Sequence, residues 1–386
     1  MSEYPVLEHT YLLREVHELR RFGWDIQTIS IRKPAPRSGV LSGEEQEELR
    51  STWYILDSRI LPHIASQIAT LLTRPGRYLQ GLATAWQFEE FGLKRFLLAT
   101  AYFLEAVTTG QRLQKAGIRY FHSVYSTTVA RILAQVFDIN LSMTLHGSAE
   151  FVDPKSFALA EKVRASQRVC SISYFGKSQI MLSSSRSDWH KPRVTPLGVN
   201  LRDTGQRPFR ANPKPFRLIS IGRLVETKGC PLLLSAVASL KSEGRDIHLT
   251  LVGDGPLRQG LEQHAMDLGI DDCASFPGWC SQENLQTLLA ESDACVLASL
   301  AEGVPVVLME AMAVGVPCIA PRINGIPELI RDGIDGRLFT PSNVGELVAS
   351  IREIASNSRL RRANVQCVAR VRRRKVRLSQ EYEVIV

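Results

Sequence analysis

The second half of the chain alternates short apolar segments with helix-like segments, and this alternation restricts the possible folds more than any other feature. The apolar segments occupy residues 217–221, 247–252, 294–298 and 317–320, and a turn containing glycine follows each of them. Strands that alternate with helices predict a doubly wound parallel sheet. Because ligands of such sheets bind beyond the carboxyl ends of the strands, we expect a binding site at these turns.

The first half predicts another α/β unit, although its pattern is less regular. Residues 201–215 contain three prolines and are interpreted as a linker. We therefore expect an N-terminal domain over residues 1–200, a C-terminal domain over 216–357 and a basic tail over 358–386. In the N-terminal domain, the pattern predicts helices at 6–22 and over much of 44–115, and strands at 24–31, 120–122, 141–145, 169–173 and 193–197.

Composition is that of an ordinary globular protein. A chain of 386 residues, with 44% hydrophobic and 22% charged residues, is long enough for two domains. The seven cysteines include no CxxC pair, so neither a disulfide framework nor a zinc site is predicted. No secretory signal is recognised, and the longest apolar run, 96–107, is too short to cross a bilayer. We expect a cytoplasmic protein in a reducing compartment.

The formal charge of +8 predicts anionic partners. Anionic lipid is one such partner, and each basic residue near a membrane surface contributes roughly 1 kcal/mol. The apolar stripe at 93–107, beside Lys94 and Arg95, is compatible with interfacial binding and equally with core packing. Nucleic acid is disfavoured because the basic tail lacks interleaved aromatic residues. A solvated basic helix is the alternative interpretation of the tail, whose basic residues are Arg359, Arg361, Arg362, Arg370, Arg372, Arg373, Arg374, Lys375 and Arg377.

The segment 302–310, EGVPVVLME, carries an informative pair of carboxylates. Pro305 is predicted at the first helical position and Gly315 at a left-handed stop. Free N–H groups and the helix dipole make such a helix start an anion site. Carboxylates only accept hydrogen bonds, so beside an anion pocket Glu302 and Glu310 are suited to sugar hydroxyls. Two solvated surface glutamates are the alternative.

Two cations lie on the earlier loop that follows the segment 217–221. The planar fork of Arg223 and the flexible ammonium of Lys228 can both reach a diphosphate there. Asp254, on the next loop, is expected to shape its turn through its own backbone.

Three motifs occur in a characteristic order: RLVETKG at 223–229, the two glutamates separated by seven residues, and NGIPE at 324–328. Together they resemble the large retaining glycosyltransferase family 4, over roughly residues 3–350. Asn324 stands where the family usually has glycine, but asparagine tolerates positive φ, so the loop is expected to keep its shape. The segment 2–15 resembles that of exopolysaccharide members, such as those of colanic acid biosynthesis.

The resemblance implies a GT-B fold, in which two Rossmann-like doubly wound domains face each other across a cleft. The C-terminal domain would hold the nucleotide and the N-terminal domain the acceptor. In the segment Leu145-His146-Gly147, the histidine resembles the element that reaches the donor sugar, whereas His122 is interpreted as structural. The resemblance assigns His146, Arg223, Lys228 and Glu302 to catalysis, and Glu310, Gly303, Val304 and Gly278 to nucleotide binding.

The implied activity is retaining transfer of a hexosyl group from a nucleotide-diphosphate sugar to a polysaccharide or lipid-linked saccharide, at the inner face of a membrane. No DxD triplet occurs, so no metal is expected, and no cofactor is needed besides the donor.

Three alternatives are a GT-B sugar-nucleotide epimerase, a Rossmann oxidoreductase, for which Gly253 and Gly255 supply only part of the fingerprint, and a truncated or degenerate protein without activity. The last is considered because a helix is predicted from about Leu7, so we expect the first strand of the N-terminal domain to be missing.

Overall fold

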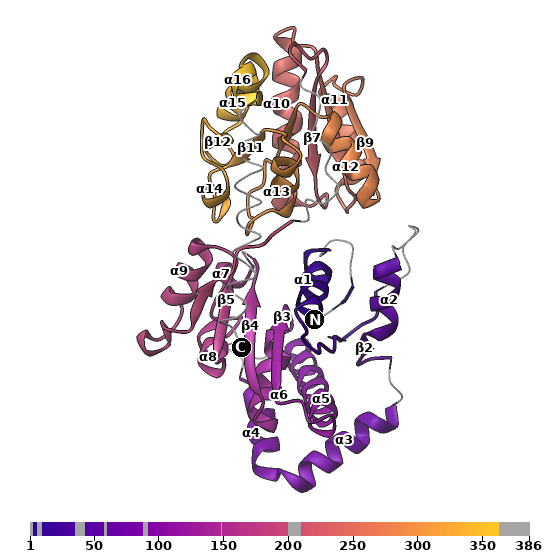
Figure 1. Cartoon of the computed structure of the whole chain (residues 1–386), viewed down its shortest axis with the longest axis vertical. Helices are drawn as coiled ribbons and strands as arrows, with labels where there is room; N and C mark the ends of the chain where they lie inside the picture. Colours follow the sequence, from indigo (N-terminus) through magenta and orange to yellow (C-terminus); the bar gives the residue numbers. More distant parts are fainter. Residues whose placement is uncertain are drawn as a thin grey trace. The chain divides into compact units, whose positions relative to one another are not determined.

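The computed structural model describes residues 3–5, 10–34, 43–57, 60–87, 92–147, 149–199 and 210–362. It divides into unit 1, Met1–Ile172 with Gly176–Thr195, and unit 2, Ser173–Phe175 with Pro196–Val386 (Figure 1). Residues 201–209 of the predicted linker and 363–386 of the predicted tail lie outside the described residues.

Unit 1 contains a four-stranded parallel sheet with the order β3-β4-β5-β6. Helices join successive strands, as a parallel sheet requires. The core between sheet and helices includes Leu141, Met143 and Val169 from the strands and Leu133 and Ile180 from the helices, all nearly inaccessible to solvent. The elements are β3 (Tyr120–Val124), α6 (Thr127–Phe137), β4 (Asn140–Leu145), α7 (Ala149–Val152), α8 (Leu159–Ala165), β5 (Arg168–Ser171), α9 (Tyr174–Leu182) and β6 (Pro192–Val194).

Upstream of this sheet, the prediction of a strand at 24–31 is mostly wrong. Only β1 (Ile29–Ser30) forms, and it pairs in parallel with β2 (Trp53–Tyr54). Gly23 turns the chain with a φ of +89° after α1 (Thr10–Arg21), and residues 24–28 form no strand, although Thr28 O accepts from Trp53 N at 3.0 Å. Propensity alone cannot make a strand where the fold supplies no ladder.

The predicted helical region at 44–115 is confirmed as helices, broken by β2 and by short loops. It comprises α2 (Gly43–Ser51), α3 (Ile60–Thr73), α4 (Pro75–Ala85) and α5 (Leu93–Lys115). Tyr78 of α4 meets Phe103 of α5 edge-on, with ring centroids 4.8 Å apart. The expected apolar stripe at 93–107 divides, because Phe103, Ala106 and Val107 are buried whereas its earlier leucines are exposed.

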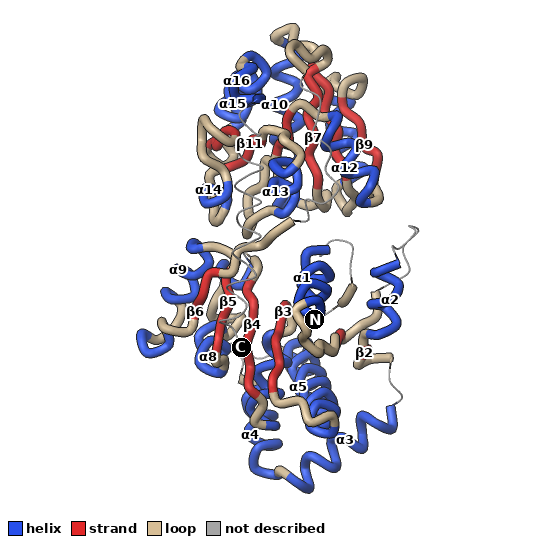
Figure 2. Tube along the Cα trace, in the orientation of Figure 1, coloured by secondary structure: helices blue, strands red, loops and turns tan. Residues whose placement is uncertain are grey.

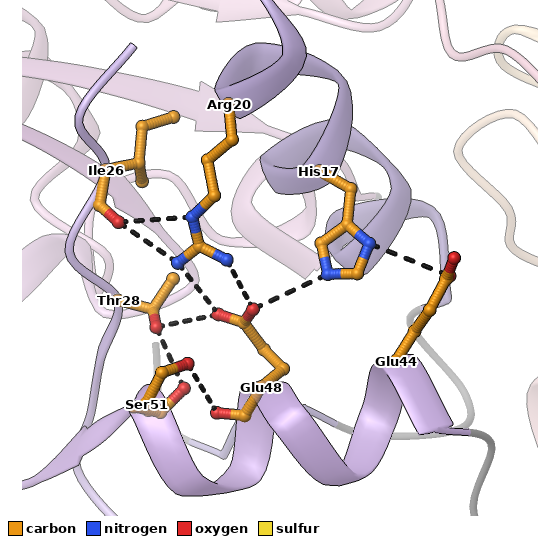
Figure 3. Close-up of polar contacts among 8 residues, drawn as sticks. His17, Arg20, Ile26, Thr28, Glu44, Glu48 and Ser51 are labelled. Carbon is orange, nitrogen blue, oxygen red and sulfur yellow. Dashed lines mark hydrogen bonds and ion pairs between the residues drawn. The ribbon is translucent and has the colours of Figure 1, made fainter. Parts of the chain in front are cut away.

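A buried carboxylate ties α1, the loop after it and α2 together (Figure 3). Glu48 is 1% exposed and accepts hydrogen bonds from Arg20 Nη1 at 2.6 Å and Thr28 Oγ1 at 2.8 Å. His17 lies between Glu48 and Glu44, at 3.5 and 3.6 Å. Because these groups satisfy one another, the adjoining cavity of about 490 Å³ is interpreted as structural.

Unit 2 contains a six-stranded parallel sheet with the order β12-β11-β10-β7-β8-β9. Figure 2 shows strands of this sheet, among them β7, β9 and β11, with helices around them. The predicted strand and helix alternation is confirmed. Side chains of α10 and α15, such as Leu234 and Ile351, pack with Leu218 and Leu249 of the sheet. The elements are β7 (Phe216–Ile221), η3 (Glu226–Lys228), α10 (Cys230–Ser242), β8 (Ile247–Val252), α11 (Arg258–Asp267), β9 (Ala274–Gly278), α12 (Gln282–Glu291), β10 (Ala294–Val296), α13 (Val306–Ala313), β11 (Cys318–Pro321), α14 (Ile326–Leu329), β12 (Gly336–Phe339), α15 (Val344–Ser356) and α16 (Ser358–Arg362).

Candidate active site

The site is built where the strand order of unit 2 reverses. From β7 the chain adds β8 and β9 on one side of the sheet, and it then returns to add β10, β11 and β12 on the other. β7 and β10 are therefore hydrogen-bonded neighbours although more than one third of unit 2 lies between them in sequence. Loops that leave such a pair diverge, which creates a crevice at the carboxyl ends of the strands.

Two predicted site residues meet at this switch point. Lys228, from the loop after β7, places Nζ 2.6 Å from Oε1 of Glu302, from the loop after β10. Ser299 Oγ donates to the same carboxylate oxygen at 2.7 Å. Glu302 is 9% exposed and Lys228 is 26% exposed, so the pair is partly shielded from water. A charge pair of this kind fixes both side chains more firmly than a fully solvated one.

The backbones of the two loops are also locked together. Leu300 N donates to Thr227 O at 2.8 Å. Gly229 has a φ of +60°, and a Cβ at this position would lie only 2.2 Å from Ala298 O. A residue with a side chain would force the loops apart, so the glycine of the RLVETKG motif is needed for the close approach.

The third motif loop packs against the second. Gly325 N donates to Gly303 O at 3.3 Å, and the side-chain amide of Asn324 donates to the backbone oxygen of Glu302. Asn324 has a φ of +47°, which confirms that asparagine accommodates the left-handed conformation expected there. Gly303 and buried Val304, on the loop after β10, therefore pack against Gly325 on the loop after β11.

The helix start differs by one residue from the prediction. Pro305 is the N-cap of α13, with φ −66° and ψ 121°, rather than the first helical residue. A proline cap has no side-chain acceptor, and no side chain caps the first turn of α13. The predicted stop is confirmed, because Gly315 follows the helix with a φ of +81°. The start of α13 can therefore offer N–H groups to an anion.

Glu310 lies farther along α13 and is partly buried. Its Oε1 accepts a hydrogen bond from Gln282 Nε2, at the start of α12, at 3.3 Å. Sequence reasoning missed Gln282 and Ser299. Each follows a strand carboxyl end, a position that would have marked both for attention.

Arg223 is exposed on the loop after β7. No ion pair of its guanidinium is found within the described part of the chain. The side chain of Lys228 folds back along this loop, because a Cβ at Gly222 would lie 3.5 Å from Lys228 Cε. Both cations of the motif are therefore carried by one loop, and only Lys228 is engaged with a carboxylate.

The turns after β8 and β9 support this edge of the sheet. Asp254 Oδ1 accepts from Gly255 N at 2.7 Å, which confirms that Asp254 shapes its own turn. Gly278 ends β9 with a φ of +77°, and its carbonyl accepts from Gly253 N at 2.9 Å. The assignment of Gly278 to nucleotide binding stays a prediction.

Glu328, the last residue of the third motif, bonds to the start of a helix. Its carboxylate accepts from the backbone N–H groups of Tyr174 at 2.8 Å and Phe175 at 2.7 Å. These are the first residues of α9, and they belong to unit 2. A carboxylate on the first N–H groups of a helix satisfies donors that would otherwise be unpaired and complements the helix dipole.

His146 follows β4 in unit 1 and packs close to two tyrosine rings. The ring centroids of Tyr11 and Tyr125 lie 5.0 and 5.6 Å from that of His146. The hydroxyls of the two tyrosines are hydrogen-bonded to each other, and burial raises the pKa of the Tyr11 phenol above its ordinary value. His122, in contrast, bonds to Ser142 and Thr144 along the neighbouring strand, which agrees with a structural role.

These features place the protein among α/β proteins with a polar site at the switch point of a parallel sheet. Residues 202–369 match the family of glycosyl transferases group 1. The chain is 25% identical over 377 residues to the amylovoran biosynthesis glycosyltransferase AmsK of Erwinia amylovora, covering 92% of this chain and 89% of that one.

Solved structures show the same fold. A glycosyltransferase from Rickettsia africae ESF-5 superposes with a TM-score of 0.67 at 18% identity, over 99% of this chain and 95% of that chain. HepE of Anabaena, in complex with UDP and glucose, gives a TM-score of 0.62 at 21% identity, over 72% and 80%. The fold is therefore GT-B, and the protein is a glycosyltransferase that carries a group 1 domain.

Proposed function

We propose that this glycosyltransferase transfers a hexosyl group from a nucleotide-diphosphate sugar to a polysaccharide or lipid-linked saccharide acceptor, with the anomeric configuration retained and without a metal ion. The Lys228–Glu302 pair at the switch point of unit 2 is the observation that carries this proposal. The relative named for amylovoran biosynthesis supports an exopolysaccharide-type acceptor, and the neighbour crystallised with UDP and glucose supports a nucleotide-sugar donor.

The pair leaves hydrogen-bonding capacity on both partners for the donor substrate: one carboxylate oxygen of Glu302 and two donors of Lys228. Glu302 Oε1 accepts from Lys228 and Ser299, whereas Oε2 accepts no bond from the described residues. An ammonium has three donors, and the carboxylate uses one donor of Lys228. Oε2 can therefore accept from a sugar hydroxyl while Lys228 donates to the adjoining phosphate.

Departure of a nucleoside diphosphate is the difficult step, because negative charge grows on the leaving group. Lys228 and the start of α13 are held by the two locked loops before substrate arrives, and Arg223 extends from the same loop as Lys228. Such preorganised donors stabilise a developing charge without reorganisation, and the loss of one typically costs about 10²–10³ in rate. Glu310 is assigned to the ribose hydroxyls and His146 to the donor sugar.

A panel of nucleotide sugars, incubated with and without saccharide acceptors, tests the activity. We expect one donor to give both transfer and slow hydrolysis, and proton NMR of the fresh product to show the anomeric configuration of the donor. Glu302→Gln should lose at least about 10²-fold in rate. A folded wild-type protein that consumes no donor, or that inverts the configuration, would overturn the proposal.

Metal independence is tested separately with a chelator. We expect EDTA to leave the rate unchanged, because cationic side chains and a helix start would hold the diphosphate. Loss of activity in EDTA that Mg²⁺ or Mn²⁺ restores would contradict this part of the proposal alone.

A further inference from the structure

Helix α3 of unit 1 has its polar and apolar faces reversed relative to an ordinary surface helix. Its polar side chains point towards α5: His63 Nδ1 lies 3.0 Å from Thr108 Oγ1, Gln67 donates to Leu104 O at 3.2 Å, and Thr70 accepts from Gln111 at 2.9 Å. Figure 1 shows α3 beside α5 at the periphery of unit 1. Soluble proteins normally turn the apolar stripe of a surface helix inward.

The apolar side chains of α3 lie on the opposite side, in solvent. Their exposed fractions run from 43% to 76%. The spacing of four residues between Ile60, Ile64, Ile68 and Leu72 places them on one helical face. We call this set the outer face of α3: Ile60, Leu61, Ile64, Ile68, Leu71 and Leu72.

The first half of α5 continues this character. Leu93, Leu97 and Leu98 are 71%, 59% and 48% exposed. Exposed apolar side chains in this number indicate an interaction site. No helix among the described residues is long and apolar enough to cross a membrane.

The charges in this part of the sequence favour one kind of partner. From Ile60 to Leu104, the described residues contain no aspartate or glutamate, and their charged side chains are Arg74, Arg77, Lys94 and Arg95, of which Arg77 pairs with Asp138 at 3.4 Å. Glu89 and Glu90 lie outside the described residues. Trp86 is 39% exposed at the end of α4, with its indole N–H bonded to Thr100 Oγ1 at 3.1 Å. Aliphatic side chains with flanking cations and an amphipathic aromatic ring are typical of an interfacial helix.

We propose that the outer face of α3, with the start of α5, docks unit 1 on an anionic lipid bilayer, with α3 lying in the plane of the interface. A second copy of the chain fits less well, because a two-fold contact through this surface would bring the same cations together. A protein partner is also disfavoured, because interface cores are enriched in aromatic residues and methionine rather than in isoleucine and leucine. The proposal rests on unit 1 alone, so it can fail without affecting the donor chemistry of unit 2.

Vesicle flotation of the full chain tests the proposal. We expect the protein to float with vesicles that contain phosphatidylglycerol and to bind vesicles of pure phosphatidylcholine more weakly. The triple variant Ile64→Gln, Ile68→Gln, Leu72→Gln should bind at least about tenfold more weakly, because three apolar side chains no longer enter the interface. Lys94→Glu with Arg95→Glu should remove the preference for phosphatidylglycerol, and added salt should weaken it in the wild type.

Matched controls are Leu182→Gln in α9 and Met266→Gln in α11, which alter apolar side chains that are 79% and 59% exposed elsewhere. Both controls should float like the wild type, and nucleotide-sugar hydrolysis should be unchanged in the triple variant. Equal flotation of the triple variant and the wild type would overturn the proposal. Absent flotation together with a dimer that the triple variant dissociates would also overturn it, in favour of a second copy.

Discussion

At the residue scale, the proposed function depends on a few charged side chains that differ in their partners. Lys228 and Glu302 are bonded to each other, Glu310 is bonded to Gln282, and Arg223 is exposed. An ion pair in a site is poor evidence for stability, since desolvation offsets much of the attraction. We therefore propose that the arrangement serves binding, because a cation beside a carboxylate suits the phosphate and hydroxyl groups of a sugar diphosphate.

Lys228→Ala and Glu310→Ala should each abolish measurable transfer while the fold is kept. We expect a loss of at least about 10²-fold in rate for Lys228→Ala, because it removes a donor to the leaving group. Lys241→Ala is a matched control, since Lys241 pairs with Asp272 at 2.6 Å on the surface. Initial rates at saturating donor, with circular dichroism of each variant, measure the effect. Wild-type turnover in either site variant would contradict the assignment.

At the element scale, buried charge fixes how helices pack in unit 1. Glu48 joins α1, the chain near Thr28 and α2, although no motif in the sequence marks it (Figure 3). Its neighbour Glu47 is exposed, so two adjacent glutamates in one helix have opposite environments. Helical periodicity can suggest which residues share a face, but it cannot identify the partner that makes a buried carboxylate acceptable.

Glu48→Ala should destabilise unit 1, because Arg20 and Thr28 would lose the acceptor that they share. We expect a loss of about 1–3 kcal/mol in the free energy of unfolding, since Arg20 remains partly solvated. Glu47→Ala removes a carboxylate from the same helix and should change stability by no more than about 0.5 kcal/mol. Denaturant unfolding followed by circular dichroism distinguishes these outcomes, and equal midpoints for the two variants would count against the anchoring role.

Helix α5 carries a carboxyl group that should make stability depend on pH. Burial raises the pKa of Glu105 to about 7 from its ordinary value of 4.5, and Oε2 accepts no hydrogen bond from the described residues. The folded state keeps a proton that the unfolded state loses, so the free energy of unfolding should fall as pH rises from about 4.5 to about 7. Glu105→Gln should reduce this slope in melting experiments. A slope identical to that of the wild type would rule out Glu105 as its cause.

At the scale of the whole molecule, the two units have separate cores, and we propose a different role for each. Unit 2 holds the motif loops, and unit 1 holds His146 and the outer face of α3. A ligand that binds only the folded protein stabilises it, by about 2.7 kcal/mol when its concentration is 100 times Kd. The donor nucleotide should therefore act first on unit 2.

Hydrogen exchange with a nucleoside diphosphate tests this division. We expect UDP, or another nucleoside diphosphate found by thermal shift, to slow exchange in segments 222–230, 298–307 and 322–330, because these loops meet at the switch point. Peptides from α3 serve as the internal control and should be unaffected. Protection confined to unit 1 would show that the donor site is placed in the wrong unit.

The sequence by itself determined the parts that depend on local chemistry. Alternating strands and helices predicted the sheet of unit 2, Asp254 predicted its own turn, and Asn324 predicted a loop that tolerates positive φ. Backbone sterics and hydrogen bonds to neighbouring residues decide such features within a few positions of the chain. The prediction of a strand at 24–31 was mostly wrong, because a strand needs a pairing partner and the local sequence does not determine whether the fold supplies one.

Only the tertiary structure decided which distant residues meet and which faces stay exposed. The Lys228–Glu302 pair exists because crossover connections make β7 and β10 neighbours. Likewise, the spacing of apolar residues in α3 predicts one apolar face, but the polar contacts with α5 turn that face outward. Periodicity records that a face exists, and only packing against the rest of the fold determines whether protein or solvent covers it.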